Sequence, residues 1–140
     1  MANAELHIAL VRLASRLADE FSALLKPVDL SLSQYNVLRI LRGAGPEGAT
    51  CGHVAERMIQ RDPDVTRLRD RLEQRGLVAG RRDATDRRIV RTRITEAGLE
   101  LLAALDAPID ELHDRHAGHM TDRQVAELRR LIEQISVHSQ

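Results

Sequence analysis

The chain has 140 residues, about one domain with its own core, and its formal net charge is zero because 21 basic residues balance 21 acidic ones. Apolar residues make up 43 % of the chain and aromatic residues 1 %, which indicates an aliphatic core and argues against modules that stack single-stranded bases on aromatic side chains. The single cysteine excludes an intrachain disulfide, and the lack of a leader-like N-terminus or a membrane-length apolar run predicts a cytoplasmic protein without membrane contact.

Two helices are expected before residue 50. Apolar residues recur at three- and four-residue spacing from Leu6 to Leu25, which predicts an amphipathic helix of about five turns that stops near Pro27. Ser31 or Ser33 is expected to cap a second helix, and the glycines of residues 43–48 end it. Aliphatic faces of this kind suit helix-on-helix packing.

The next two helices are shorter. Thr50 is expected to cap a third helix. Asp62 is expected to open a fourth, because Asp is a good cap and Pro63 suits the first helical position, and Gly76 closes this helix. The inward stripe of the fourth helix is Val65, Leu68 and Leu72.

A β-hairpin is predicted after the fourth helix. Residues 77–79 lead into a polar, turn-rich stretch at residues 81–88, and residues 89–94 follow with β-branched side chains. Two short strands around a charged loop form the wing of a winged helix-turn-helix protein.

Two further helices complete the chain. Thr95 is expected to cap a long fifth helix, which Pro108 should kink, and Thr121 or Asp122 caps a sixth. The predicted fold is therefore mainly α with a small β-hairpin wing, in the order ααααββαα. Its winged helix-turn-helix region is expected at residues 31–95, and its helical dimerisation region at residues 1–30 and 96–140, as one intertwined domain.

The first, fifth and sixth helices are long for a domain of this size. Their apolar stripes need a second surface, which the same helices of a second copy would supply, so a symmetric homodimer is expected. The residues expected in the dimer interface are Leu6, Leu10, Leu128, Leu131, Ile132 and Ile135.

The neutral total charge conceals a basic segment. Twelve arginines lie between Arg57 and Arg93, where only six acidic residues accompany them, so this segment carries a net charge of +6 and the rest of the chain −6. Such a concentration indicates a polyanionic partner, and nucleic acid fits best. Arginine is well suited to this role because its planar fork binds phosphate and guanine through paired hydrogen bonds.

The fourth helix is interpreted as the recognition helix. Its N-terminal turns would reach base edges, so Asp64, Thr66 and Arg67 are the predicted base contacts. Arg61 and Arg71 are expected to hold phosphates, which orients a protein without reading sequence. The alternative is a solvated helix whose charges form ordinary surface pairs.

The hairpin supplies a second basic element. Arg81, Arg87 and Arg88 lie in or beside its tip, and a basic tip of this kind can enter the minor groove. Asp86 is interpreted as a support that fixes the guanidinium of Arg88. The alternative is a polar turn with arginines that serve solubility.

The chain resembles the MarR family of bacterial transcription regulators in four stretches. The wing residues Asp86-Arg87-Arg88 match the family's Asp-x-Arg signature, and Ile94-Thr95-Glu96-Ala97-Gly98 matches the entry to its long fifth helix. Leu32-Ser33-Gln34-Tyr35-Asn36-Val37-Leu38 resembles the second helix, and Val65–Glu73 followed by Gly76-Leu77-Val78 resembles the recognition helix and its exit. All four occur in order and at family spacing.

The resemblance implies a homodimer that binds pseudo-palindromic double-stranded DNA. It also implies that Asp70 pairs with Arg88, which would tie the recognition helix to the wing. Many members release DNA when a small phenolic or lipophilic effector enters a crevice between the dimer helices and the DNA-binding lobe; no residues for such a site are apparent here. Arg69 departs from the family, which often has an apolar residue at this position. Its aliphatic stem is expected to lie along the core and its guanidinium to point toward DNA.

One cysteine and three histidines are candidates for sensing roles. Cys51 begins the third helix, where a helix dipole lowers a thiol pKa, but an incidental or structural cysteine is the favoured interpretation. His113, His116 and His119 have a spacing at which imidazoles can share a metal, yet solvated histidines are the default. No metal site, cofactor or catalytic set of residues is predicted.

The leading hypothesis is a sequence-specific DNA-binding transcription regulator, a ligand-responsive repressor of the MarR type and not an enzyme. One alternative is a winged-helix module that docks an acidic protein through its arginines. Another is a redox- or metal-responsive switch.

Overall fold

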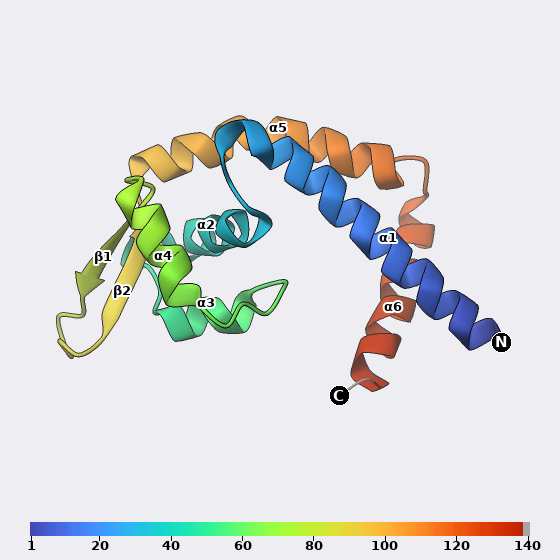
Figure 1. Cartoon of the computed structure of the whole chain (residues 1–140), viewed down its shortest axis with the longest axis horizontal. Coiled ribbons are helices and arrows are strands. Elements are labelled where there is room, and N and C mark those ends of the chain that lie inside the picture. Colours follow the sequence, from blue (N-terminus) through green and yellow to red (C-terminus); the bar gives the residue numbers. More distant parts are fainter. Residues whose placement is uncertain (139–140) are drawn as a thin grey trace. The chain divides into compact units, whose positions relative to one another are not determined.

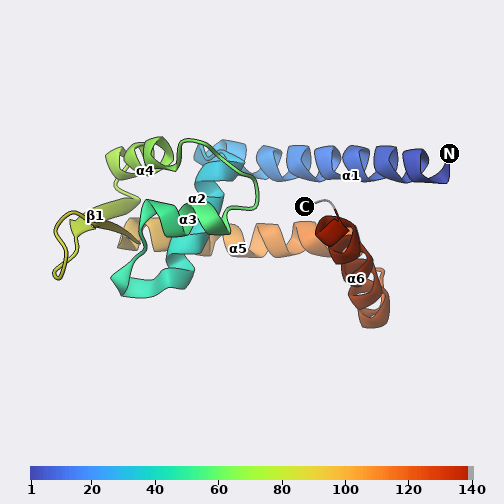
Figure 2. The same cartoon turned by 90° about the horizontal axis from the view of Figure 1, so that it is seen from below.

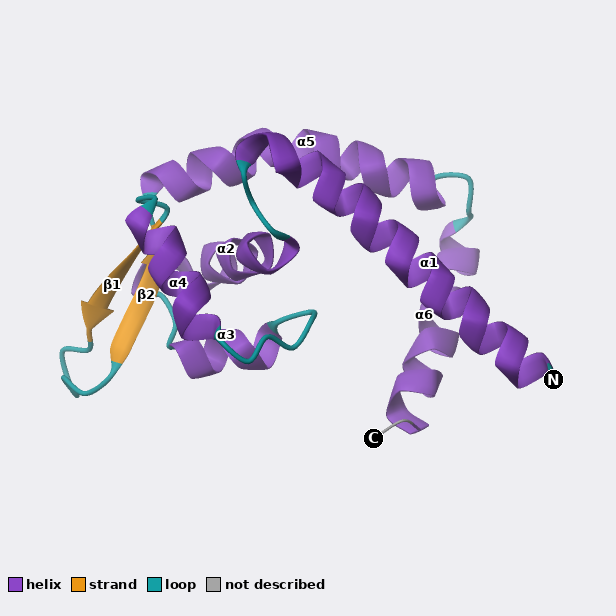
Figure 3. Ribbon diagram, in the orientation of Figure 1, coloured by secondary structure: helices purple, strands orange, loops and turns teal. Residues whose placement is uncertain are grey.

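A computed structural model describes residues 1–138 of the chain, and its elements follow the predicted order ααααββαα (Figure 1). The two short strands form a hairpin and helices make up most of the remainder (Figure 3). The elements are α1 (Ala2–Leu25), α2 (Leu32–Ala44), α3 (Cys51–Arg57), α4 (Val65–Gln74), β1 (Val78–Arg82), β2 (Val90–Ile94), α5 (Glu96–Ala117) and α6 (Asp122–His138), with single 3-10 turns η1 (Lys26–Val28) and η2 (Gly45–Glu47) on either side of α2.

Side-chain caps start most of these helices and settle two open alternatives. Ser31, rather than Ser33, caps α2 in a reciprocal capping box with Gln34. Thr121, rather than Asp122, caps α6 in the same way, because its hydroxyl accepts a hydrogen bond from Gln124 N at 3.1 Å. Thr50 caps α3 as predicted. Each cap satisfies backbone N–H groups that the first helical turn leaves without a partner.

The start of α4 differs from the prediction. The helix begins at Val65 and its cap is Asp64, whose carboxylate accepts a hydrogen bond from Arg67 N at 3.0 Å. Asp62 instead accepts from Asp64 N at 2.9 Å, within the turn that precedes the helix. Both aspartates are followed by residues that tolerate a helical start, so the local pattern alone did not distinguish them.

The chain divides by packing into two compact units, Met1–Asp106 and Ala107–Gln140. The first unit is built around α2, where Val37, Leu38 and Leu41 are almost fully buried. Leu25, Leu72 and Leu102 complete this aliphatic core from α1, α4 and α5. Each fully buried leucine contributes about 1.5–3 kcal/mol through the removal of apolar surface from water.

The hairpin is anchored to the core by one face of its strands. β1 and β2 are antiparallel with Val78 opposite Ile94 and Arg82 opposite Val90. Val78, Thr92 and Ile94 are buried and share the face that packs inward. Ala49 adds an isolated bridge to Thr92, with backbone hydrogen bonds of 2.8 and 2.9 Å, so a third backbone segment fixes the outer edge of β2.

Gly48 permits this third segment to approach β2. Its φ is +71°, a conformation that residues with a side chain rarely adopt. A Cβ atom on Gly48 would also collide with the backbone carbonyl of Thr92. The sequence pattern around this glycine indicates only the end of a helix.

The second unit consists of the end of α5 and the whole of α6. Ile109 and Leu112 are buried, and α5 remains a continuous helix through Pro108. The sequence predicts a different division, by role: a DNA-binding region at residues 31–95 and a dimerisation region at residues 1–30 and 96–140. This division remains a prediction, and its last two positions lie outside the described residues. No helix within residues 1–138 is both long and apolar enough to cross a membrane.

Candidate nucleic-acid interface

Helix α4, the predicted recognition helix, presents a charged outer face because its apolar face is anchored. Val65 and Leu72 are buried, and α4 packs against α2, α3 and β1. Thr66, Arg67 and Arg71 are exposed on the remaining surface. Arg61, in the loop that leads to the helix, is also exposed. These four predicted contacts are therefore accessible to a ligand.

Asp64 has a different position from these residues. Its backbone lies at the helix start where base contacts were predicted, but its carboxylate is engaged in the cap with Arg67 N. The cap fixes the first turn of α4, from which the Arg67 side chain extends. A direct base contact by Asp64 remains a prediction.

Arg69 is held within the protein. Its guanidinium donates to Asp70 Oδ1 at 2.7 Å and lies 3.8 Å from the Cys51 sulfur on α3. The hydrogen bond with Asp70 raises the pKa of Arg69, and the side chain is only 20 % exposed. The long stem folds along the α3–α4 contact as expected, but its charge is compensated by a neighbouring carboxylate, which leaves little of it to offer to DNA.

The expected ion pair between Asp70 and Arg88 is not formed. Asp70 is occupied by Arg69, whereas Arg88 pairs with Asp86 at 3.1 Å. Each arginine pairs with an aspartate that is one or two residues away in the chain. Such a pair forms without fixing the long segment between α4 and the wing tip. The recognition helix and the wing tip are thus not joined by this ion pair.

The wing tip is ordered by two aspartates. Asp86 accepts hydrogen bonds from both the backbone N and the guanidinium of Arg88, which lowers the pKa of Asp86. Asp83 accepts from the backbone N and the hydroxyl of Thr85, which lowers the pKa of Asp83. The contact expected between Asp86 and Arg88 is therefore present, and the Arg88 side chain is 91 % exposed.

Two further contacts position the wing and the loop that precedes α4. Glu73 of α4 accepts a hydrogen bond from Gly80 N of β1 at 2.9 Å. Buried Asn36 of α2 accepts from Ile59 N at 2.7 Å and holds the loop that leads to α4. Neither role was predicted, although both residues lie inside the motif stretches, so the motifs contain positioning residues as well as the predicted DNA contacts.

One arginine of the basic segment is structural. Arg75 donates to the carbonyl oxygens of Asp29 at 2.6 Å and Val28 at 3.0 Å, which joins the end of α4 to the turn after α1. A net charge counted along the sequence does not separate such a residue from those that face outward.

The predicted contacts gather at one end of the first unit. α4 and the hairpin lie side by side (Figure 2), and β1 contacts α4 directly. Arg81, Arg87 and Arg88 of the wing are exposed, as are the predicted residues of α4 apart from Arg69. A helix and a neighbouring hairpin, both with exposed guanidinium groups, form a surface suited to two adjacent grooves of a duplex.

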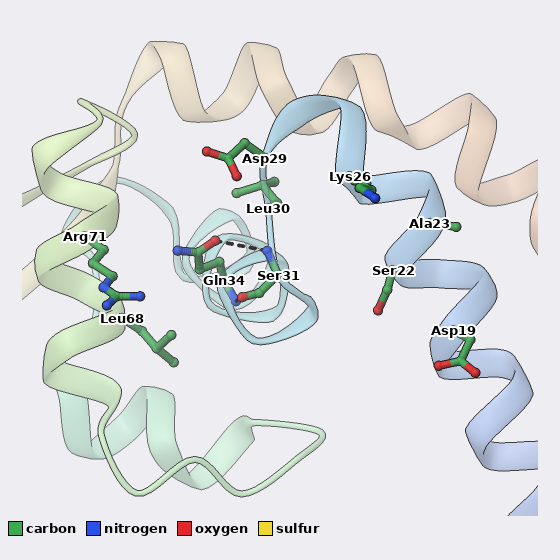
Figure 4. Close-up of a pocket in the computed structure, with 10 residues that line it drawn as sticks. All are labelled: Asp19, Ser22, Ala23, Lys26, Asp29, Leu30, Ser31, Gln34, Leu68 and Arg71. Atoms are coloured by element: carbon green, nitrogen blue, oxygen red, sulfur yellow. Dashed lines mark hydrogen bonds between the residues drawn. The ribbon is translucent and has the colours of Figure 1, made fainter.

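A groove lies behind this surface, within the first unit (Figure 4). Leu68 and Arg71 of α4 border one side, and Asp19 and Ser22 of α1 the other. Its volume is about 650 Å³, and Leu30, Lys26 and Gln34 also line it. It combines apolar surface with two cations, Lys26 and Arg71, and two carboxylates, Asp19 and Asp29.

The candidate sensing residues do not form a metal site. No group of three histidine, cysteine or acidic side chains within residues 1–138 is arranged to hold a metal ion. Cys51 has a free thiol that is partly covered.

The terminal helices expose the apolar stripes predicted for a dimer interface. Leu6 on α1 is 49 % exposed, and Leu128 and Ile135 on α6 are 45 % and 42 % exposed. Leu131 and Ile132 are exposed to a similar degree, and Leu10 is half-buried. Within α6 no described residue is buried.

Comparisons with known proteins agree with this geometry. The model of the MarR family matches residues 28–89. A MarR transcription factor from Planctomyces limnophilus, known from its crystal structure, is 39 % identical over 93 % of this chain and 94 % of its own, with a TM-score of 0.72. The HTH-type transcriptional repressor IacR of Pseudomonas putida is 29 % identical over 89 % of this chain and 73 % of its own. CouR from Rhodococcus jostii RHA1, whose crystal structure contains p-coumaroyl-CoA, is 29 % identical over 93 % of this chain and 90 % of its own, with a TM-score of 0.80.

Proposed function

This chain belongs to the MarR family of DNA-binding transcription regulators, and from that premise we propose that it is a homodimeric repressor which a small effector releases from a pseudo-palindromic operator. The observation that carries the proposal is the shared surface of α4 and the wing, where exposed arginines of two adjacent elements lie on one unit. The protein is a regulator and not an enzyme. Its site of action would be the cytoplasm, where bacterial DNA lies.

The two elements would bind DNA differently. The first turns of α4 would enter the major groove, where Arg67 can donate two hydrogen bonds to guanine O6 and N7. Arg61 and Arg71 would bind phosphates on either side of that groove. Arg87 and Arg88 at the wing tip would enter the adjacent minor groove, where negative potential is concentrated.

A second copy of the chain is the proposed partner of the apolar stripes on α1 and α6. Leucine and isoleucine side chains that are more than two-fifths exposed recur on both helices, and apolar stripes of this kind are typical of protein–protein interfaces. A two-fold axis would place two recognition helices on the same side of a duplex, about one helical turn apart. The operator would then consist of two inverted half-sites.

The groove between α1, α2 and α4 supports the effector part of the proposal. Leu30 and Leu68 would suit the ring of a small aromatic molecule, Lys26 and Arg71 would suit its phenol or carboxylate group, and Asp19 and Asp29 could accept a hydrogen bond from a phenolic hydroxyl. Arg71 is also a predicted phosphate contact, so a ligand that engages its guanidinium would compete with DNA. CouR, which binds a coumaroyl thioester, is a relative with an effector of phenolic type.

A salt titration tests the proposal. The protein is titrated with the intergenic DNA upstream of its own gene and with shuffled DNA of the same composition, each at several salt concentrations. We expect specific binding that weakens by about 10³- to 10⁵-fold between 50 and 200 mM salt, the range typical of six to ten phosphate contacts. Equal affinity for both DNAs at every salt concentration would contradict the proposal. Addition of a phenolic carboxylate should release the specific complex.

A further inference from the structure

The strands of the wing have a second face that points away from the core. Because side chains alternate along a strand, the buried residues Val78, Thr92 and Ile94 define the inner face, and the intervening positions define the opposite one. Arg81, Arg91 and Arg93 occupy that opposite face, and all three are exposed. We call these three residues the outer wing face.

The outer wing face borders a groove. The turn η2 contributes Pro46 and Glu47 to its lining, and the strands and their loop contribute the remaining residues. Its volume is about 350 Å³. The three arginines of the outer wing face all line it, so their side chains share one concave surface.

The charges of this groove are not balanced within the chain. Asp83 pairs with Arg91 at 3.5 Å, but its carboxylate also accepts two hydrogen bonds from Thr85 and is only 17 % exposed. Glu47 is the second acidic residue of the lining. Arg81 and Arg93 have no ion pair within the part of the chain that the structure describes.

The register of the hairpin makes this arrangement costly without a ligand. Arg81 lies directly opposite Arg91 on the neighbouring strand, and like charges in that position destabilise a sheet. Arg93 extends the same row of positive charge by two residues. An anion that lies across the row would remove the repulsion, and paired guanidinium donors are suited to phosphate oxygens.

We propose that the outer wing face binds backbone phosphates of the DNA that flanks each half-site, on the side of the wing opposite α4. This inference rests on the proposed function, because it requires the wing tip to lie in the groove next to the one that α4 occupies. A duplex that continues beyond the tip would run along the face that points away from α4. The flanking contact is independent of base sequence and lengthens the bound DNA segment without changing the operator sequence.

Trimmed and extended operators test the inference. Two fragments share the same half-sites; one ends at the positions contacted by the wing tips, and the other continues for about ten base pairs on each side. Arg93→Gln is the main variant, because Arg93 has no ion pair to lose. The double variant Arg91→Gln/Arg93→Gln extends it, and Arg129→Gln on α6 removes the same charge elsewhere as a control.

We expect wild-type protein to bind the extended fragment about ten-fold more tightly than the trimmed one. Arg93→Gln should reduce this advantage and lower the slope of log affinity against log salt by about 2 for a dimer on the extended fragment, because each lost phosphate contact lowers it by about 1. It should leave binding to the trimmed fragment unchanged, and Arg129→Gln should match wild type on both.

Three results would overturn the inference. If Arg93→Gln lost the same affinity for both fragments, Arg93 would contact DNA inside the half-site. If it lost affinity for neither, the outer wing face would not contact DNA. The proposed function would stand in both cases. If wild-type protein bound neither fragment specifically, the proposed function itself would fail. Thermal unfolding of each variant shows whether the hairpin remains folded.

Discussion

The protein exposes two surfaces that differ in chemistry. The arginines of α4 and the wing are exposed but remain hydrated, and Asp86 or backbone carbonyls position several of them. Several leucines and isoleucines of α1 and α6 are also exposed, but water does not compensate apolar groups. Exposed charge tolerates the absence of its partner, whereas exposed apolar surface does not. The arginine surface therefore suits a partner that binds reversibly, and the apolar stripes suit a partner that is bound permanently.

Charge placed in the apolar stripe should produce the largest effect. Leu131→Asp/Ile132→Asp puts two carboxylates on the stripe of α6 and, by symmetry, four in a dimer. Each buried leucine or isoleucine contributes about 1.5–3 kcal/mol, so we expect the dimer dissociation constant to rise at least about a thousand-fold. Analytical ultracentrifugation measures the change, and operator affinity should fall with it.

Glu133→Gln, on the polar face of the same helix, is the matched control and should leave the dimer intact. A Leu131→Asp/Ile132→Asp protein that sediments as wild type would show that the stripe is not the interface.

A side chain at Gly48 should disconnect the wing while leaving the terminal stripes unchanged. Gly48→Ala combines a positive φ with a collision against the Thr92 carbonyl, so we expect a loss of about 2 kcal/mol or more in unfolding free energy. Gly43→Ala is the control, because a Cβ on Gly43 meets nothing within 4 Å and alanine is the better helix former, which predicts a gain of up to about 1 kcal/mol. Urea unfolding measures both, and equal stability of the two variants would refute this role of Gly48.

Removal of the predicted base contact should relax specificity and spare the fold. Arg67→Ala removes a guanine contact that discriminates between bases by about 1–3 kcal/mol in each half-site, so the ratio of operator to shuffled-DNA affinity should fall by about 5- to 150-fold per half-site. Arg88→Ala should instead weaken binding to both DNAs by similar factors, because a wing-tip contact carries little sequence information. Competition binding distinguishes the two, and an unchanged ratio for Arg67→Ala would exclude it as the reader.

The smallest expected effect concerns the pH range of the wing tip. Hydrogen bonds from Arg88 hold the Asp86 pKa below its ordinary value of 3.8. Because the folded pKa is lower than the unfolded one, the contact stabilises the wing above the unfolded value and is lost as the pH falls through the folded value. NMR titration of the Asp86 carboxyl should show a pKa that returns toward 3.8 in Arg88→Ala, and an identical pKa in both proteins would contradict the contact.

The sequence predicted most of the fold because its signals are local. Capping residues and apolar spacing located all six helices, and β-branched residues after a polar turn located the hairpin. The start of α4 was placed at Asp62 instead of Asp64, since both positions carry the same capping side chain. The bridge between Ala49 and Thr92 was missed because a single paired residue leaves no periodic pattern.

The site was less predictable than the fold. Exposure of Arg67, Arg71 and the wing arginines followed from their spacing relative to buried residues. The sequence did not predict the partners of Arg69, Arg75 and Asp70. A long side chain can reach several acceptors, and tertiary packing decides which one it contacts. Charge counts along the chain therefore predict that a basic surface exists but not which arginines form it.

Hydroxyl-radical footprinting of the operator tests the central claim most directly, because it reports where both basic elements of both protomers meet DNA. We expect two protected segments related by inverted symmetry, with centres about one helical turn apart, each flanked by protection of the minor groove next to it. One protected segment alone, or protection spread evenly along the fragment, would contradict a dimer that holds duplex DNA through α4 and the wing.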